Sequence, residues 1–258
     1  MISVTELEQH IIDEVPNLKK IEAYSYLQAL LRVIGIGISD VQIQNIVLEI
    51  LYKETSPQFF TITATKSGSI TNSFLGQNPG SEIYHVLNMC SRLNRLLQIE
   101  LILNVEVKTG VMLVRKIHFE EALAATVLHD FRKCGGVSDF DDSKSDPYHG
   151  QKGAEIFTKY AKKTTLEDSR IQRIASIIRY HDGRFSPLLR DKYSHSALSL
   201  QEILHEETQD PLATLLSYQV HSLDMLTSNG LTPSPSEPER KLFLQYLMLT
   251  NEYLNCAD

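Results

Sequence analysis

Apolar side chains recur every three or four residues along much of the chain, which is the spacing of the buried face of an α-helix. In residues 1–56 two such stretches stand out, from Leu27 to Ile34 and from Ile43 to Ile50. They predict two or three helices in this part of the chain. The same spacing predicts further helices over 84–97, 119–134, 150–161, 166–181 and 212–228, and a last one from about 239 to 253.

Two segments break this pattern. Residues 59–81 are rich in Thr, Ser and Gly, and residues 101–114 place β-branched side chains around a Lys-Thr-Gly turn. The first is typical of a small β-hairpin or a structured loop, and the second of another hairpin or a continued helix. In the helix predicted over 119–134, Glu120 and Glu121 suit the N-terminus, and the two glycines at 135 and 136 predict the end.

Longer polar stretches separate the later helices. A polar connection carrying Pro187 and Pro211 precedes the helix over 212–228, and a proline-rich break spans 232–239. We therefore expect an all-α fold with room for one or two small hairpins. Residues 1–70 are predicted to form an N-terminal helical accessory region, and residues 71–258 the main helical domain with a C-terminal helix.

Composition narrows the class of protein. Apolar residues make up 42% and charged residues 22% of the 258, as in ordinary globular proteins. The net charge of -7 provides no global positive field for a nucleic-acid backbone. The three cysteines are widely spaced, which argues against a disulfide framework or a zinc ribbon. No apolar stretch is long enough to span a membrane, so a cytoplasmic protein without a membrane partner is expected.

Two aspartates fall within apolar helical stretches. Asp130 lies three residues after Val127, and Asp224 lies four residues after Val220, so each shares a helix face with a core residue. An ionised carboxylate in such surroundings costs several kcal/mol unless it is paired or bound to a cation. These stretches offer no obvious buried Lys or Arg for both aspartates. A divalent metal ion is therefore the predicted partner.

The histidines strengthen this hypothesis. His181 continues the apolar stripe of the helix over 166–181, so it is predicted to point inward. His129 directly precedes Asp130. Imidazole and carboxylate ligands together suit Mn, Fe, Co or Ni, with Mg or Zn as further candidates. A divalent ion polarises a phosphoryl oxygen and lowers the pKa of bound water toward ~7.

The order of these residues resembles the HD superfamily of metal-dependent phosphohydrolases, in which a His is followed by His-Asp and then by Asp. Here the order is His85, then Ala-Thr-Val-Leu-His-Asp-Phe-Arg-Lys with His129 and Asp130, then Ser-Leu-Asp-Met-Leu-Thr-Ser with Asp224. Lys133 completes the HDxxK pattern of that family. The resemblance implies an HD-type helical bundle over about residues 75–230, with these residues as metal ligands and Lys133 facing a substrate phosphate.

Two further histidines resemble the additional ligands of binuclear HD proteins. Pro-Tyr-His-Gly-Gln-Lys-Gly-Ala-Glu-Ile-Phe places His149 at the start of a predicted helix. Ile-Ile-Arg-Tyr-His-Asp-Gly is similar to a segment of HD-type 3′-to-5′ exoribonucleases, which usually carry two adjacent histidines where this chain has Tyr180 and His181. The segment after Asp224 also resembles the end of HD domains in CRISPR nucleases and conjugation-associated proteins. One or two ions are expected.

The resemblance implies an enzyme that hydrolyses phosphoester bonds. Asp130 and Lys133 are the predicted catalytic residues, and a nucleotide or single-stranded nucleic acid is the predicted substrate. Two alternatives stay open, a mononucleotide or dNTP phosphohydrolase and a non-catalytic regulatory domain that binds a nucleotide. The sequence does not predict an oligomeric state.

Several residues next to the predicted ligands suit either a functional or a purely structural role. Lys152 and Arg184 adjoin predicted ligands and are candidates for binding substrate phosphate, but ordinary surface positions suit them equally. Asp182 is a candidate to orient an imidazole. His221 shares a helix face with Asp224 and suits a supporting or core position better than metal ligation. Phe185, like Tyr180, suits either base stacking or the core.

Overall fold

The computed structural model describes residues 2–63, 79–106 and 116–228, and within these ranges every regular element is a helix. This confirms the expected all-α fold. The α-helices are α1 (Val4–Glu14), α2 (Ala23–Gly37), α3 (Val41–Lys53), α4 (Ser81–Glu106), α5 (Lys116–Leu128), α6 (His149–Ala161), α7 (Asp168–Tyr180), α8 (Pro187–Tyr193), α9 (Leu200–Thr208) and α10 (Pro211–Ser228). Three short 3₁₀ turns are η1 (Leu18–Lys20), η2 (Pro57–Thr61) and η4 (Gly183–Phe185).

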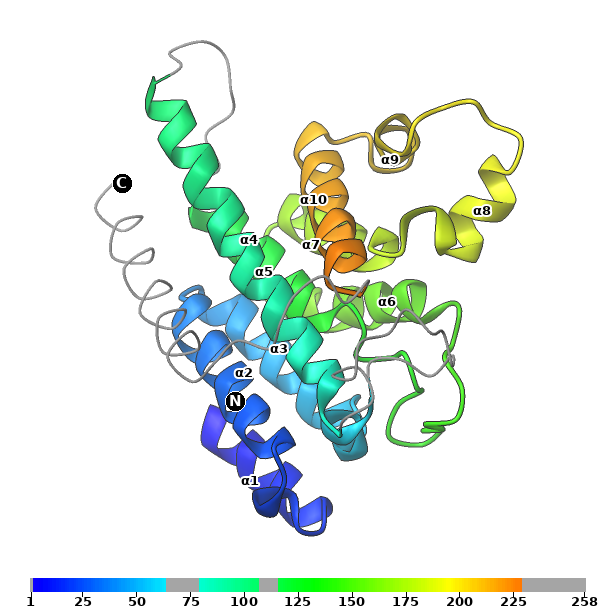
Figure 1. Cartoon of the computed structure of the whole chain (residues 1–258). Coiled ribbons are helices and arrows are strands. Elements are labelled where there is room, and N and C mark those ends of the chain that lie inside the picture. The colour runs from blue at the N-terminus through cyan, green and yellow to red at the C-terminus, as the bar shows by residue number, and fades with distance from the viewer. Residues whose placement is uncertain (1, 64–78, 107–115, 229–258) are drawn as a thin grey trace.

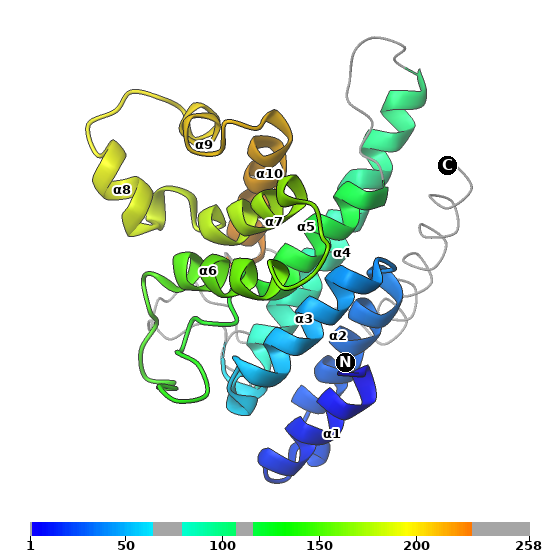
Figure 2. The same cartoon turned by 180° about the vertical axis from the view of Figure 1, so that it is seen from behind.

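Helices α4 and α5 lie at the centre of the molecule (Figure 1). Helices α2 and α3 pack on one side of this pair, and α7 and α10 pack on the other (Figures 1 and 2). Helix α6 packs along α7, while α8 and α9 lie at the periphery. No helix in the described ranges has the length and apolar character needed to cross a membrane.

One continuous hydrophobic core joins the N-terminal helices to the rest. Its buried side chains run from Leu7 on α1 to Leu223 on α10. The first three helices therefore share a core with the helices that carry the predicted ligands. The expected boundary between 1–70 and 71–258 falls among residues that the structure does not describe, so that division stays a prediction.

Local sequence signals explain several helix starts. Ser3 and Glu6 form a reciprocal capping box at α1, and Ser199 and Glu202 form another at α9. Asp40 accepts hydrogen bonds from two backbone N–H groups at the start of α3. Prolines occupy the first positions of α8 and α10, where a missing N–H costs nothing. The polar stretch before α10 was expected to be an irregular connection, and this is wrong, because it contains the two helices α8 and α9.

The helix predicted over 119–134 begins and ends earlier than expected. Helix α5 starts at Lys116 and stops at Leu128, and the chain then follows tight turns to Gly135. Gly135 has a φ of +88°, and a Cβ there would lie 2.3 Å from the carbonyl oxygen of Asp139. Consecutive residues on an α-helix point about 100° apart. Leaving the helix lets His129 and Asp130 both face the same cluster.

The hairpin expected over 101–114 is wrong in its first half. Residues 101–106 continue α4, which was the alternative, while 107–115 lie outside the described residues. The hairpin expected over 59–81 begins with the 3₁₀ turn η2, in which Phe59 and Phe60 are buried. Its centre at 64–78 is not described. The proline-rich break and the C-terminal helix beyond 228 also lie outside the described residues.

Two glutamates on α5 tie the central helix to both sides of the molecule. Glu120 accepts hydrogen bonds from the Ser39 hydroxyl and the Asp40 backbone N–H between α2 and α3. Glu121 accepts from Arg170 and Arg173 on α7. Both glutamates are buried. Because α5 begins at Lys116, they are buried partners in its second turn and not the N-terminal residues that the sequence predicted.

Replacing Glu121 should destabilise the fold strongly. Glu121→Gln removes the buried carboxylate that Arg170 and Arg173 share and leaves them only their partly exposed partners Asp40 and Asp210. Breaking a buried pair costs about 3–5 kcal/mol, and the remaining partners place this variant at the lower end. Urea denaturation followed by circular dichroism measures the change in the free energy of unfolding. The matched control is Glu49→Gln, which breaks the exposed pair with Lys53 and should cost less than about 1 kcal/mol. Equal effects of the two variants would contradict the assignment.

Asp40 should make stability depend on pH. Burial acts to raise the pKa of its carboxyl, but the hydrogen bond from Arg170 and those from two backbone N–H groups outweigh burial and lower the pKa below its usual 3.8. A lowered pKa stabilises the fold above about pH 3.8, and this contribution is lost as the pH falls through the lower, folded-state pKa. Asp40→Asn retains a capping side chain but removes the charge.

The stability difference between the native chain and Asp40→Asn should therefore be constant near neutral pH and shrink below about pH 3.8. Urea denaturation from about pH 7 to about pH 3 measures it. A difference that grows on acidification would have the wrong sign for this ion pair.

Candidate metal centre

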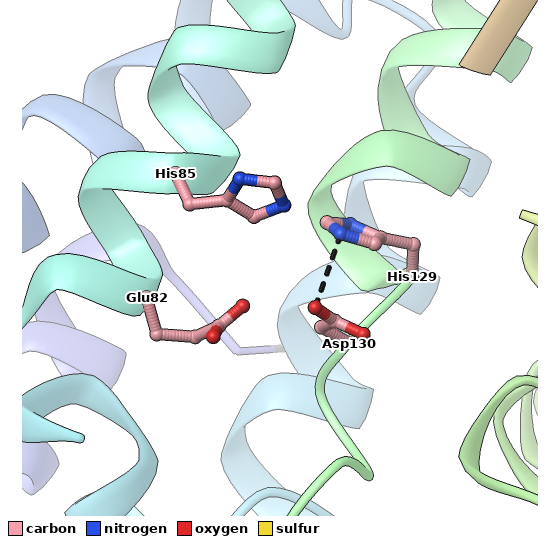
Figure 3. A group of neighbouring side chains, drawn as sticks. All are labelled: Glu82, His85, His129 and Asp130. Carbon is pink, nitrogen blue, oxygen red and sulfur yellow. Dashed lines mark ion pairs between the residues drawn. The ribbon is translucent and has the colours of Figure 1, made fainter. Parts of the chain in front are cut away.

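Side chains from five parts of the chain meet in one cluster between the central helices and α6, α7 and α10. Figure 3 shows two of these contributions facing each other, the first turn of α4 and the turn after α5. The cluster consists of Glu82 and His85 on α4, His129 and Asp130 after α5, His149 at the start of α6, His181 and Asp182 just after α7, and Asp224 on α10. All but the last two aspartates are buried.

Asp130 lies at the centre of this cluster and presents its two carboxylate oxygens to different neighbours. Its Oδ1 is 2.8 Å from Nε2 of His149 and 3.4 Å from Nε2 of His181. Its Oδ2 is 3.3 Å from Nε2 of His129. A carboxylate in this position can bridge two cations, one on each side.

The imidazole rings are held in orientations that suit metal ligation. Three histidines place Nδ1 2.7–2.8 Å from a backbone carbonyl oxygen three residues earlier: His129 to Thr126, His149 to Asp146 and His181 to Ile178. In each pair the Nδ1–H donates to the carbonyl. In the neutral ring such a bond fixes the tautomer and leaves Nε2 with the lone pair that a metal ion would bind. All three Nε2 atoms face Asp130.

The donor atoms form three overlapping groups, each compact enough to hold a metal ion. The atoms of each group lie within 4.8 Å of one another. The groups are Glu82–His85–His129–Asp130, then Asp130–His149–His181, and finally His181–Asp182–Asp224. The first two consist entirely of buried residues and share Asp130. All six ligands predicted from the sequence belong to these groups.

Glu82 is a member of the cluster that the sequence analysis missed. It is fully buried, and its Oε2 atom lies 3.1 Å from Nζ of Lys133. Burial is the main cause that raises the pKa of its carboxyl to about 8. A signal was present, because Glu82 precedes His85 by three residues and the two share a helix face. Glu-x-x-His is a ligand spacing found in carboxylate-bridged metal sites of helical bundles.

The carboxylates of the cluster raise the proton affinity of two of its histidines. Burial acts to lower the pKa of His181, yet the carboxylates of Asp182 and Asp130 raise it to about 10. The pKa of His149 is also raised, mainly by Asp130 against the effect of burial. A position that attracts protons this strongly also attracts a divalent cation, which would replace them.

Two buried atoms at the centre have no hydrogen-bond partner. They are Oε1 of Glu82 and Nε2 of His129, both in the first donor group. Buried polar atoms are normally satisfied, because an unsatisfied one costs about 1–3 kcal/mol. A carboxylate oxygen and an imidazole nitrogen that point at the same space are suitable ligands for a first-row transition metal. The residues present therefore fit an ion in this group.

Lys133 contacts the carboxylates of this group. Its Nζ lies 2.8 Å from Oδ2 of Asp130 and 3.1 Å from Oε2 of Glu82. Burial acts to lower the pKa of this ammonium, but these two carboxylates raise it well above its usual value. In this arrangement Lys133 supplies a cationic partner for Asp130, which the sequence did not anticipate, and its predicted contact with phosphate stays a prediction.

Asp224 contacts residues from two sides of the cluster. Its Oδ1 lies 3.1 Å from Nε2 of His85, but its donor group joins it to His181 and Asp182. Burial acts to raise the pKa of Asp224, and the hydrogen bond with His85 lowers it well below the usual range. Asp182, proposed as an orienting carboxylate, lies 3.5 Å from Nε2 of His149 and is itself a candidate ligand.

Close backbone approaches bring the second and third groups together. A Cβ on Gly150 would lie 3.0 Å from the Ile178 carbonyl, so the small residue lets α6 approach α7. His221 donates from Nδ1 to the carbonyl oxygen of His181 at 2.7 Å, and its ring packs on Gly183. His221 thus supports the backbone at His181, in line with the interpretation favoured from the sequence.

The two basic side chains predicted to bind substrate phosphate, Lys152 and Arg184, have other partners in the structure. Lys152 is half-exposed and pairs with Asp146, which precedes His149 in the loop. Arg184 is exposed and donates to the carbonyl oxygen of Leu198. Neither contact involves the cluster, so both roles stay predictions.

Of the two aromatic candidates, Tyr180 is buried and donates its hydroxyl to Glu207, whereas Phe185 is exposed. Of the two roles considered for Tyr180, base stacking and packing in the core, its burial supports packing in the core.

Comparison of the chain with family models, curated proteins and solved structures finds no match. The chemistry of this centre consequently rests on its own geometry.

Loss of the shared carboxylate should weaken metal binding at both buried groups. We expect Asp130→Asn to lower Mn²⁺ affinity at least about 10-fold at each, because even supporting residues of metal sites contribute this much. His149→Ala should spare the group that contains Glu82. Calorimetric titration and elemental analysis of the full chain measure both effects, with circular dichroism to verify folding.

The matched control is His195→Ala, which removes an exposed histidine outside the cluster. Uptake by Asp130→Asn equal to that of the native chain and the control would show that Asp130 is not a ligand.

Proposed function

We propose that this protein is a metal-dependent phosphohydrolase of the HD type that cleaves a phosphoester bond in a nucleotide or single-stranded nucleic acid. The observation that carries the proposal is the buried pair of donor groups that share Asp130. The cluster is compatible with an HD-like domain, because the residues it brings together are those of the HD pattern in the sequence. The proposed cofactor is one or two divalent ions, with Mn, Fe, Co or Ni preferred.

The donor set supports hydrolysis better than a structural role for the metal. Structural zinc sites are closed by four ligands and commonly use cysteine. Here the ligand atoms are imidazole and carboxylate, and Cys90 is a buried thiol whose pKa burial raises to about 12. A divalent ion held by these residues would supply Lewis acidity toward a phosphoryl oxygen and would lower the pKa of bound water.

Each residue has a definable task in this proposal. Asp130 holds the two donor groups at a fixed separation through its two oxygens. The three histidines with bonded Nδ1 atoms present Nε2 without having to reorient. Lys133 carries a positive charge at the edge of the first group, and cations engaged by Asp130 and Glu82 would free its ammonium for the non-bridging oxygens of a phosphate.

The proposal is tested with the full chain supplied with Mn²⁺ or Fe²⁺. Bis-p-nitrophenyl phosphate, a panel of nucleotides and a single-stranded oligonucleotide are the substrates. Hydrolysis of a phosphoester is expected, and Asp130→Asn should abolish it. Release of phosphate from mononucleotides without shortening of the oligonucleotide would select the nucleotide phosphohydrolase. Hydrolysis of none of these substrates by metal-loaded protein would overturn the proposal.

Lys133→Gln separates a role in the reaction from a role as a counter-ion. If the ammonium stabilises phosphate oxygens, kcat should fall about 100-fold while the metal content of the chain is unchanged. If Lys133 only neutralises Asp130 and Glu82, its replacement should alter stability or metal content and leave kcat per bound ion intact. His195→Ala serves again as the control with unchanged rates.

A further inference from the structure

Phe185 presents an aromatic ring to solvent beside the cluster. It is 67% exposed, more than any other large hydrophobic residue in the described ranges. Single exposed apolar residues are common and need no explanation by themselves. The position of Phe185 in the fold distinguishes it from the others.

The backbone that carries Phe185 is held in place on both sides. Phe185 closes the turn η4 through a hydrogen bond from its N–H to the carbonyl oxygen of Asp182 at 3.1 Å. Gly183 within this turn has a φ of +53°, and a Cβ there would lie 2.6 Å from the His221 ring. Pro187 then begins α8. The ring is thus presented from an ordered turn and not from a free loop.

The same turn contributes directly to the cluster. Asp182, which begins it, lies 3.6 Å from Nε2 of His181 and 3.5 Å from Nε2 of His149. A 3₁₀ helix rises about 2.0 Å per residue, so Phe185 lies about 6 Å along the turn from Asp182. An aromatic side chain is therefore within one nucleotide's reach of the candidate ligands.

In the part of the chain that the structure describes, this edge is one of two places at which the cluster reaches solvent, the other being Lys133, whose side chain is 20% exposed. The side chains of Asp182 and Asp224 are 28% and 13% exposed, whereas Glu82 and His129 are fully buried. With cations bound to offset the two carboxylates, a phosphate could reach the centre along the edge formed by His181, Asp182 and Asp224. The rest of its molecule stays outside, on the side from which η4 departs.

We propose that Phe185 stacks on the nucleobase of a substrate whose phosphate lies at the Asp182–Asp224 edge. This inference rests on the proposed function and names the recognised group as a nucleobase. The net charge of -7 gives no broad field for tracking a phosphate backbone, so stacking on one base supplies affinity that charge does not. Stacking accepts any base, which implies little base preference at this position.

The absence of tryptophan from the chain makes a direct test possible. Phe185→Trp introduces the chain's single tryptophan at the proposed contact, and a stacked base should quench its emission. Titrations use thymidine monophosphate, a short oligothymidylate and deoxyribose 5-phosphate, which lacks a base. The matched control is Val41→Trp, a single tryptophan at the start of α3, where the native side chain is 60% exposed.

Quenching at position 185 by the base-containing ligands, but not by deoxyribose 5-phosphate and not at position 41, is the expected result. Quenching by the oligothymidylate alone would identify a single strand as the source of the base. Quenching by none of the ligands, or equal quenching by the base-free sugar phosphate, would overturn the proposal.

A second measurement compares Phe185→Ala with Val41→Ala. Loss of stacking should weaken nucleotide binding about 5- to 100-fold in the first variant and leave the second unchanged. Because fluorescence and binding do not require turnover, the two proposals can fail separately. Quenching without hydrolysis would remove the proposed function and keep the stacking contact, and hydrolysis without quenching would do the reverse.

Discussion

The buried carboxylate of Asp130 is the constraint on which the rest of the structure depends. Removing an ionised carboxylate from water costs several kcal/mol, and the cost is met only by partners placed at short range. Lys133 and three imidazoles surround Asp130, and although burial acts to raise its pKa, Lys133 holds that pKa well below the usual range. Beside it, burial raises the pKa of the Glu82 carboxyl to about 8, so that at neutral pH this group holds a proton that a bound cation would displace. The centre is built to attract a further positive charge.

The fold positions these groups through contacts that lie outside the cluster. The end of α5 at Leu128 releases His129 and Asp130 from helical geometry, and the turn that follows is closed at Gly135. Glu121 fixes the preceding helix to α7, which ends next to His181. These contacts therefore fix the position of α7 relative to α5. A centre assembled from distant parts of the chain needs such rigid connections.

The sequence predicted what depends on local periodicity. His181 continues the apolar stripe of its helix and is buried, and Asp130 likewise followed from its distance to Val127. The sequence failed where tertiary contacts decide. An acidic residue in the first turn of a helix is normally a surface group, and only the packing of α4 against its neighbours buries Glu82. The polar sequence around α8 and α9 hides two helices whose small core includes Tyr193 and Ile203.

The three donor groups differ in solvent exposure, so one end of the cluster is buried and the other is partly open. The groups that contain Glu82 and His149 are closed, and the group that contains Asp182 is partly open. Charges in a closed, low-dielectric space interact more strongly than charges in water, so the closed groups suit permanent cations. The open group faces solvent, where a ligand can exchange. With cations in the closed groups, the strongest positive potential would therefore lie at the closed end of the cluster, opposite the Asp182 edge.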